Sequence, residues 1–191
     1  MSSRPLIATT AESVVTAFAG AKPSWITLPS KDEELPSELR LALADFDAGG
    51  RPAAKAAGDW LRTEAVAAHQ TSRTRLLIAS GRIAGFYSLA SAQVELSQHD
   101  RRRAAVAPVR VPAALITWIA KDRRTEIEGK LLLLHAVATA RRAAELQATA
   151  VLVADPFDER TAAMWRKRYG FRPSAEPRKP KRLWLPLEPA G

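Results

Sequence analysis

The sequence predicts an α/β (α+β) fold, in which helices flank a mixed and mostly antiparallel sheet. The chain has 191 residues, of which 47% are hydrophobic, so it can bury a sizeable core. Helically spaced apolar residues alternate with short apolar runs, in the order helix, helix, three strands, helix, strand, helix, strand. This order is typical of a mixed sheet. We expect residues 1–30 to form an N-terminal extension and residues 31–191 to form a single domain.

The first half of the chain contains two predicted helices and two predicted strands besides a short N-terminal one. Trp25–Leu28 lies between two prolines and is expected to be a short strand. Leu39–Phe46 has helical spacing. Pro52–His69 is expected to be a second helix, because its proline fits a first turn and an apolar stripe follows. Ser72–Ala79 and Ile83–Leu96 are expected to form two strands joined by a tight turn.

The second half is predicted to place a long helix between two apolar strands. Val106–Trp118 is apolar and β-branched, and the pattern continues to Lys121. A long helix is expected over Ile127–Leu146, and a buried strand over Ala148–Ala154.

The last predicted helix has recognisable signals at both ends. Asp158 is a good N-cap for a helix over Glu159–Tyr169, and Gly170 is a good residue to end it. A final strand is predicted at Leu183–Leu185.

Composition excludes several classes of protein. The chain has no cysteine, which excludes a disulfide framework, a thiolate zinc site and a cysteine nucleophile. His69, His99 and His135 are too far apart in sequence to suggest a metal site, so none is expected. The longest run of leucine, isoleucine and valine is Leu131–Leu134, far short of a membrane span, and the N-terminus lacks the apolar stretch of a secretory signal. We therefore expect a cytoplasmic protein without a membrane span.

The positive charge is concentrated near the C-terminus. The formal net charge is +9, and residues 160–182 contain nine Lys and Arg against one acid. A second basic cluster comprises Arg101, Arg102, Arg103 and Arg110. Clustered arginine is typical of proteins that bind a polyanion, because guanidinium groups match phosphate geometry. A merely solubilising surface is the alternative for any single arginine.

One segment has the layout of an anion-binding loop, with a strand, a charged turn, a glycine and then a long helix. In this layout backbone N–H groups at the helix start point toward a phosphate. Within it, we take the following as candidate coenzyme-binding residues: Ile119, Ala120, Lys121, Arg124, Glu126, Ile127, Glu128, Gly129, Lys130 and Leu131.

Five stretches together carry a resemblance to a known family. Phe46–Gly49 resembles its Phe-x-x-Gly segment, Asp59–Ala65 its Trp-Leu-Arg helix, and Gly85–Ala90 its Gly-Tyr-Tyr-x-Leu strand. Val111–Asp122 resembles the Pro…Leu-Ala-x-Asp strand, and Met164–Phe171 the Phe-Tyr…Gly-Phe helix end. In this order they resemble the GNAT-type N-acetyltransferases, and among these the toxins that acetylate aminoacyl-tRNA.

The resemblance implies a GNAT acyl-CoA N-acyltransferase fold and acetyl-CoA as the acetyl donor. It implies an enzyme that acetylates the α-amine of aminoacyl-tRNA and so blocks translation, within a toxin–antitoxin system. It also implies a tRNA partner and a ribbon-helix-helix antitoxin, and it leaves a homodimer open. The basic clusters supply the candidate RNA-binding residues Arg101, Arg102, Arg103, Arg166, Lys167, Arg168, Arg178, Lys179, Lys181 and Arg182.

The chain departs from the family pattern at two sites. The coenzyme loop of the family begins with Arg or Gln and ends in a small residue, whereas here these positions are Glu126 and Leu131. The family's tyrosine, which acts as general acid toward the leaving thiolate, aligns with Trp165, and indole is a poor acid. Tyr169, one turn further along, is the candidate catalytic residue, and Tyr87 is the other tyrosine available.

The departures keep a second hypothesis open. The chain is alternatively a catalytically degenerate GNAT-like domain that acts as an RNA- or protein-binding module. A small-amine acetyltransferase is a third and weaker alternative, because the acid-poor C-terminal region does not favour a polycationic substrate.

Overall fold

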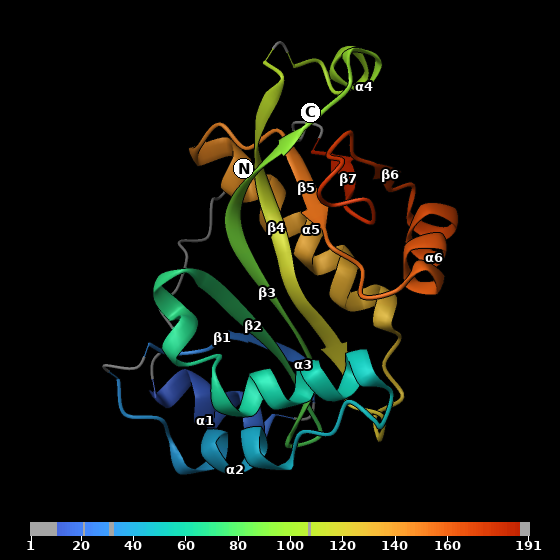
Figure 1. Ribbon diagram of the computed structural model, residues 1–191. Coiled ribbons are helices and arrows are strands. Elements are labelled where there is room, and N and C mark those ends of the chain that lie inside the picture. The colour runs from blue at the N-terminus through green and yellow to red at the C-terminus, as the bar shows by residue number, and fades with distance from the viewer. Residues whose placement is uncertain (1–10, 21, 31–32, 107, 188–191) are drawn as a thin grey trace. The chain divides into compact units, whose positions relative to one another are not determined.

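The computed structural model describes residues 11–187 apart from 21, 31, 32 and 107. Figure 1 labels its helices and strands. In chain order they are α1 (Ala11–Ala19), β1 (Ser24–Thr27), α2 (Ser37–Asp45), α3 (Pro52–Thr63), the 3-10 turn η1 (Ala67–Gln70), β2 (Ser72–Ala79), β3 (Arg82–Glu95), α4 (Gln98–Arg103), β4 (Arg110–Lys121), α5 (Gly129–Leu146), β5 (Val151–Ala154), α6 (Glu159–Tyr169), β6 (Arg172–Pro173) and β7 (Leu183–Pro186).

The described strands form a mixed sheet in the order β1-β2-β3-β4-β5-β7-β6. β4 and β5 pair in parallel, whereas β1 with β2, β5 with β7, and β6 with β7 pair antiparallel. The parallel pair needs a long crossover, and α5 supplies it. The predicted fold class, a mixed and mostly antiparallel sheet with helices, is therefore confirmed.

The chain divides into two compact units. Unit 1 comprises Met1–Ser88 and Trp118–Leu132, and unit 2 comprises Leu89–Thr117 and Leu133–Gly191. The long elements β3, β4 and α5 each contribute residues to both units.

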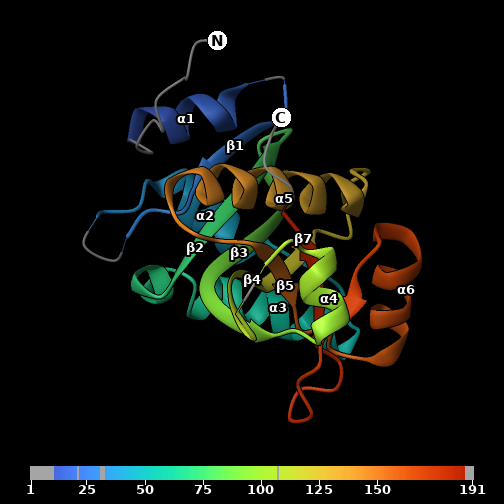
Figure 2. The same ribbon diagram turned by 90° about the horizontal axis from the view of Figure 1, so that it is seen from above.

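The predicted N-terminal extension contributes to the larger apolar cluster of unit 1. Val14 of α1 and Ile26 of β1 are buried in it, and α1 contacts β1, beside which it lies in Figures 1 and 2. The strand predicted at Trp25–Leu28 is β1, shifted by one residue. Because its apolar side chains are part of this core, the segment from residue 11 onward is an integral part of unit 1.

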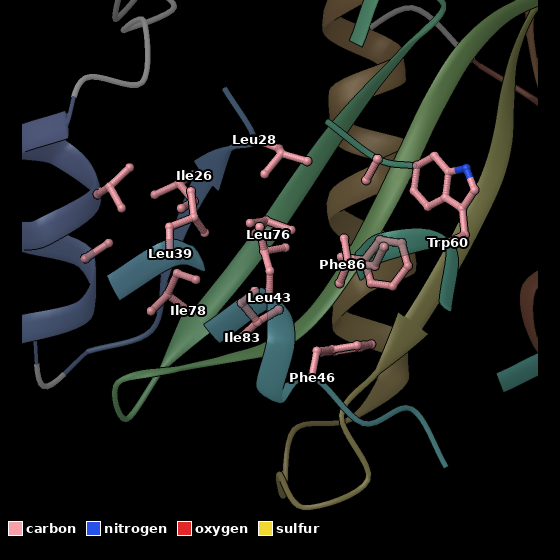
Figure 3. Close-up of a cluster of buried hydrophobic side chains, with 14 of the residues drawn as sticks. Ile26, Leu28, Leu39, Leu43, Phe46, Trp60, Leu76, Ile78, Ile83 and Phe86 are labelled. Carbon is pink, nitrogen blue, oxygen red and sulfur yellow. The ribbon is translucent and has the colours of Figure 1, made fainter. Parts of the chain in front are cut away.

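Aromatic rings join α3 to the sheet within this cluster. Trp60 stacks on Phe86 of β3 with ring centroids 6.1 Å apart, and on Trp118 of β4 at 5.5 Å. Phe46 meets Phe86 edge-on at 5.5 Å. Offset and edge-on ring pairs of this kind add specificity to apolar burial. Figure 3 shows Trp60, Phe86 and Phe46 in the same cluster as the aliphatic side chains of α2, β1 and β2.

Unit 2 has its own core of β3, β4, β5 and β7 side chains, with Trp184 at 0% exposure. Helix α6 ends where its sequence signals predicted. The Asp158 carboxylate accepts a hydrogen bond from the Thr161 N–H at 2.7 Å, which lowers the pKa of that carboxyl. Gly170 adopts φ 74°, a left-handed conformation that glycine favours after a helix.

The structure differs from the sequence-based expectations mainly in short elements. The expectations omitted α1, α4 and β6. The expected helix over 52–69 ends at Thr63 and continues as η1, and the strand expected from Ala148 begins at Val151. Among the described helices, none combines the length and the apolar character needed to span a membrane.

Candidate functional site

The candidate site lies within unit 1, where β4 ends and α5 begins. It consists of the end of β4, the β4–α5 loop (residues 122–128) and the first turn of α5. Its predicted residues from Ile119 to Leu131 are therefore brought together. β4 pairs with β5 only from Ala113 to Ile116, because β5 ends at Ala154. The last residues of β4 thus extend beyond the end of β5.

Asp122 is the buried polar centre of this region, with 1% exposure. Its carboxylate accepts hydrogen bonds from the Asp47 N–H at 3.0 Å and from the Arg124 N–H at 2.8 Å. The Arg124 guanidinium binds both carboxylate oxygens, at 2.9 and 2.6 Å. Burial by itself would raise the pKa of Asp122, but these hydrogen bonds outweigh it and lower the pKa to about 2. Asp122 is therefore a carboxylate at neutral pH.

Arg124 and Arg123 tie the β4–α5 loop to the segment between α2 and α3. The Arg124 guanidinium also bonds Asp45 at 3.1 Å, and its two carboxylate partners raise its pKa further. The Arg123 side chain pairs with Asp47 at 2.8 Å, and the Arg123 N–H donates to the Asp47 carbonyl. The stretch resembling Phe-x-x-Gly is thus fixed beside the stretch resembling Leu-Ala-x-Asp.

Two further residues support this junction. The Arg62 guanidinium of α3 donates to the Phe46 carbonyl at 2.6 Å. Gly49 has φ 98° and donates its N–H to Asp47 at 2.8 Å. A side chain at Gly49 would strain the backbone, because other residues rarely adopt that φ. Three of the stretches that carried the resemblance therefore meet in one place.

Lys121 fills the inside of the β4–α5 loop. Its half-buried ammonium donates to the carbonyls of Thr125 and Ile127, both at 3.1 Å. The Thr125 hydroxyl bonds the carbonyls of Ala84 and Asp122, at 3.2 and 3.0 Å. The loop is therefore held by side chains that point inward, away from a ligand on its outer side.

The outer side of the loop is open at the first residue of α5. A Cβ placed on Gly129 would meet no atom within 4 Å, and Leu131 is 42% exposed. The side chains of Glu126, Glu128 and Lys130 are also exposed. The first N–H groups of a helix have no partner within it, so this end of α5 offers donors to an anion.

The predicted catalytic and aromatic residues lie in different environments. Trp165 is 7% exposed and packs edge-on against Phe171 with centroids 4.9 Å apart, so it is a core residue of unit 2. Tyr169 lies half-buried at the end of α6 with its ring 6.5 Å from that of Trp165. Tyr87 has 0% exposure and packs against Trp25 in unit 1. Of the two tyrosines, only Tyr169 is accessible to a substrate.

The predicted RNA-binding residues fall into two groups. The exposed group has side chains available to a phosphate, and Arg166 belongs to it although it pairs with Glu159. Lys179 is 3.8 Å from Asp155, and Lys181 donates to the Phe157 carbonyl at 2.8 Å. The exposed group comprises Arg102, Arg103, Arg166, Lys167, Arg168, Arg178, Lys179 and Lys181, while Arg101 is half-buried.

Arg182 is a correction to the sequence-based prediction. It is 4% exposed and binds Asp155 through two hydrogen bonds of 2.7 and 2.6 Å. It also pairs with Glu176 at 3.3 Å, and Asp155 is the main cause of its raised pKa. A guanidinium enclosed in this way has no face left for a phosphate. Arg182 instead holds the segment between β6 and β7 in place.

Sequence reasoning missed the acidic partners of the site. Asp122 and Asp47 lie inside the stretches that carry the resemblance, but the predicted site residues include neither of them, nor Asp45. The sequence does contain two nearby acids, Asp45 and Asp47, and two adjacent arginines, Arg123 and Arg124, which pair with each other in the structure. This signal was not decisive because the partners are 75 to 79 residues apart in sequence.

No protein-family model and no curated protein matches the sequence. Solved structures do match. AtaT complexed with acetyl-methionyl-tRNAfMet gives a TM-score of 0.70 at 20% identity, covering 86% of this chain and 95% of that chain. A Tyr-to-Phe variant of KacT gives 0.67 at 17% identity, covering 85% and 95%. AtaTR bound with AcCoA gives 0.65 at 20% identity, covering 86% and 94%. The chain therefore has the GNAT fold of AtaT and KacT, as the sequence resemblance implied.

Proposed function

We propose that this protein is an acetyl-CoA-dependent N-acetyltransferase that acts as a toxin, acetylating the α-amine of aminoacyl-tRNA and so blocking translation. The observation that carries the proposal is the fold match to AtaT, which covers 95% of a protein solved with acetyl-methionyl-tRNAfMet. Identity of 20% leaves the activity itself to be tested, so the geometry of the β4–α5 loop is the second support.

The residues present suit a coenzyme bearing a pyrophosphate. Gly129 leaves the start of α5 open, and the N–H groups of the first helical turn favour an anion. The acidic side chains of Glu126 and Glu128 are exposed, so the backbone of the loop is what a pyrophosphate would contact. Leu131, which departs from the family's small residue, is partly exposed and leaves Gly129 uncrowded.

The reaction needs little covalent help from the protein. Bound coenzyme supplies an activated acetyl thioester. Backbone N–H groups at Ile119–Lys121, where β4 extends past β5, would bind the pantetheine arm and polarise the carbonyl. Attack by the neutral α-amine would form the C–N bond and break the C–S bond, with the amine's proton passing to solvent and the leaving thiolate protonated by a general acid of the protein. Positioning of the two reactants provides much of the rate.

Tyr169 is the proposed general acid for the leaving thiolate. Trp165, which aligns with the family's tyrosine, has an indole that is buried and poorly acidic. Tyr87 is enclosed in unit 1. Tyr169 is half-buried and has a phenolic hydroxyl, so it is the remaining candidate.

The partners that we propose are tRNA and an antitoxin. The exposed cations of α6 and of the loop between β6 and β7 offer a surface for the tRNA backbone. AtaT has been solved bound to the C-terminus of the antitoxin AtaR. A ribbon-helix-helix antitoxin is accordingly the proposed protein partner, and the cytoplasm, where charged tRNA is used, is the proposed location.

The first test is binding of acetyl-CoA by calorimetry, followed by acetyl transfer to charged tRNA. Gly129→Trp is the sharpest variant, because the space around Gly129 accommodates a side chain without disturbing the fold. We expect the wild type to bind and transfer, and the variant to lose both while its unfolding temperature is unchanged. Failure of the wild type to bind at millimolar coenzyme would refute the acetyltransferase assignment.

A second candidate function is a binding module that has lost turnover. The burial of Trp165 at the position of the family's tyrosine is the observation that favours it. This module would bind tRNA with the same salt dependence as the enzyme but would transfer no acetyl group. The transfer assay on charged tRNA therefore separates the two candidates.

A further inference from the structure

Lys121, the last residue of β4, directs its ammonium group at the backbone of the β4–α5 loop. Its ammonium group donates to the carbonyls of Thr125 and Ile127, each at 3.1 Å. Arg123 and Arg124, in contrast, are paired with carboxylates: Arg123 with Asp47, and Arg124 with Asp122 and with Asp45 at the end of α2. The Lys121 side chain is half-buried beneath the loop, so it does not present its charge on the outer surface.

The two carbonyls fix the direction of two N–H groups. In a planar trans peptide the C=O of one residue and the N–H of the next point in opposite directions. Because the Thr125 and Ile127 carbonyls point at Lys121, the N–H groups of Glu126 and Glu128 point away from it. These N–H groups alternate along the loop and precede Gly129, the first residue of α5, whose N–H has no acceptor within the helix.

Resting on the proposed function, we propose that Lys121 is a positioning residue for coenzyme binding. It turns the carbonyl oxygens of the loop inward and so presents the N–H groups of Glu126 and Glu128 to the pyrophosphate. An ammonium at this place also removes the repulsion that inward carbonyl oxygens would otherwise exert on each other. The arrangement accounts for an anion site in a loop whose exposed side chains at Glu126 and Glu128 are acidic.

The test compares Lys121→Met, which keeps the length of the side chain and removes its donors, with Lys121→Arg, which keeps the charge and the donors. Lys55→Met is the matched control, because Lys55 is an exposed lysine of α3 that pairs only with Asp59 among the described contacts. Coenzyme A affinity is measured by calorimetry. Turnover is measured with acetyl-CoA and with S-acetylpantetheine, which lacks the pyrophosphate.

We expect Lys121→Met to weaken coenzyme A binding roughly 10- to 100-fold, the loss typical of hydrogen bonds to a charged group. The KM for acetyl-CoA should rise while kcat/KM for S-acetylpantetheine stays at the wild-type value. Lys121→Arg should restore most of the affinity, and Lys55→Met should match the wild type. Unchanged coenzyme A affinity in Lys121→Met, or an equal loss with both acyl donors, would overturn the inference.

A measurement on the wild type covers the case in which Lys121→Met does not fold. Titration with inorganic pyrophosphate, followed by amide NMR, should shift the Glu126 and Glu128 signals most within the loop. Absence of those shifts refutes the role of Lys121. A wild type that binds coenzyme A without transferring acetyl refutes only the proposed function. Normal acetyl transfer with an unaffected Lys121→Met refutes only the inference.

Discussion

At the scale of single residues, unit 1 is organised by one buried carboxylate. Asp122 joins the end of β4 to the α2–α3 segment through Arg124 and the Asp47 N–H. A buried charge of this kind is costly unless every oxygen is paired, and here both oxygens accept at least two hydrogen bonds. Removing the charge would leave the Arg124 guanidinium with Asp45 as its remaining carboxylate partner.

The first prediction concerns Asp122 and pH. Because its pKa falls from 3.8 to about 2 on folding, the unfolded chain takes up the proton first as pH is lowered. The stabilisation is complete above about pH 5 and is lost as pH falls toward 2; it amounts to about 2 kcal/mol at neutral pH. Asp122→Asn should be less stable than the wild type by about this amount at pH 7, and the difference should shrink as the pH falls below about 5.

Urea unfolding at pH 7, 5 and 3 checks this prediction. Asp59→Asn is the control, because Asp59 is an exposed carboxylate in a surface ion pair, and such pairs contribute little. A difference between Asp122→Asn and the wild type that does not vary with pH would contradict the linkage.

The second prediction concerns the general acid. If Tyr169 protonates the leaving thiolate, Tyr169→Phe should lower kcat by about 100-fold with little change in KM, since general acids typically contribute 10²–10⁴-fold. Tyr87→Phe removes the hydroxyl of the buried tyrosine and should keep the wild-type kcat. Steady-state kinetics with charged tRNA measure both variants. A wild-type kcat in Tyr169→Phe would assign Tyr169 to packing at the end of α6.

At the scale of elements, the first turn of α5 packs closely on β3. A Cβ at Gly85 would lie 2.8 and 2.9 Å from the two Cδ atoms of Leu132 and 3.1 Å from the Ala120 carbonyl oxygen. Leu132 is buried, so it has little room to move. The close approach of α5 at Leu132 therefore requires glycine at this position of β3.

Gly85→Ala should consequently destabilise the protein by about 1–2 kcal/mol through overpacking. Gly129→Ala is the matched control, because nothing lies within 4 Å of the added methyl group and a helix start suits alanine. Its stability should equal or slightly exceed that of the wild type. Equal stability of the two variants in chemical denaturation would show that α5 adjusts its position freely.

At the scale of the whole molecule, only part of the net charge of +9 is available to a partner. Arg182, Arg124 and Arg123 are committed to carboxylates within the fold. Lys167 and Arg168 on α6 are exposed, and within the part of the chain that the structure describes no ion pair joins them to a carboxylate. Long-range attraction of a polyanion therefore depends on a subset of the cations rather than on the total charge.

The double variant Lys167→Glu/Arg168→Glu should weaken tRNA binding and flatten its salt dependence. Each phosphate contact that is lost should reduce the slope of log K against log salt by about 1. Lys22→Glu/Lys55→Glu makes the same change in net charge at exposed positions of unit 1 and should leave the slope nearly unchanged. Measurement of tRNA binding between 50 and 200 mM salt distinguishes the two double variants. Identical slopes would show that only the net charge matters, not the position of the cations.

Features that depend on neighbouring residues could be predicted from the sequence. Asp158 and Gly170 marked both ends of α6, because capping involves groups within three residues of the helix end. Apolar spacing located β2, β3 and α5, and the order of five short stretches indicated the fold. Composition excluded cysteine chemistry and located the basic window.

The charges that are available to a ligand could not be predicted in this way, because they depend on long-range packing. The sequence suggested three cations for phosphate binding, Lys121, Arg124 and Arg182. In the structure, Lys121 donates to carbonyls of the β4–α5 loop, and the two arginines bind carboxylates. The partners of Arg124 and Arg182 include groups 79 and 27 residues away, so spacing along the chain gives no sign of them. Whether a charged side chain can bind a ligand depends on the groups packed against it in the fold. Packing brings together segments that are far apart in the sequence.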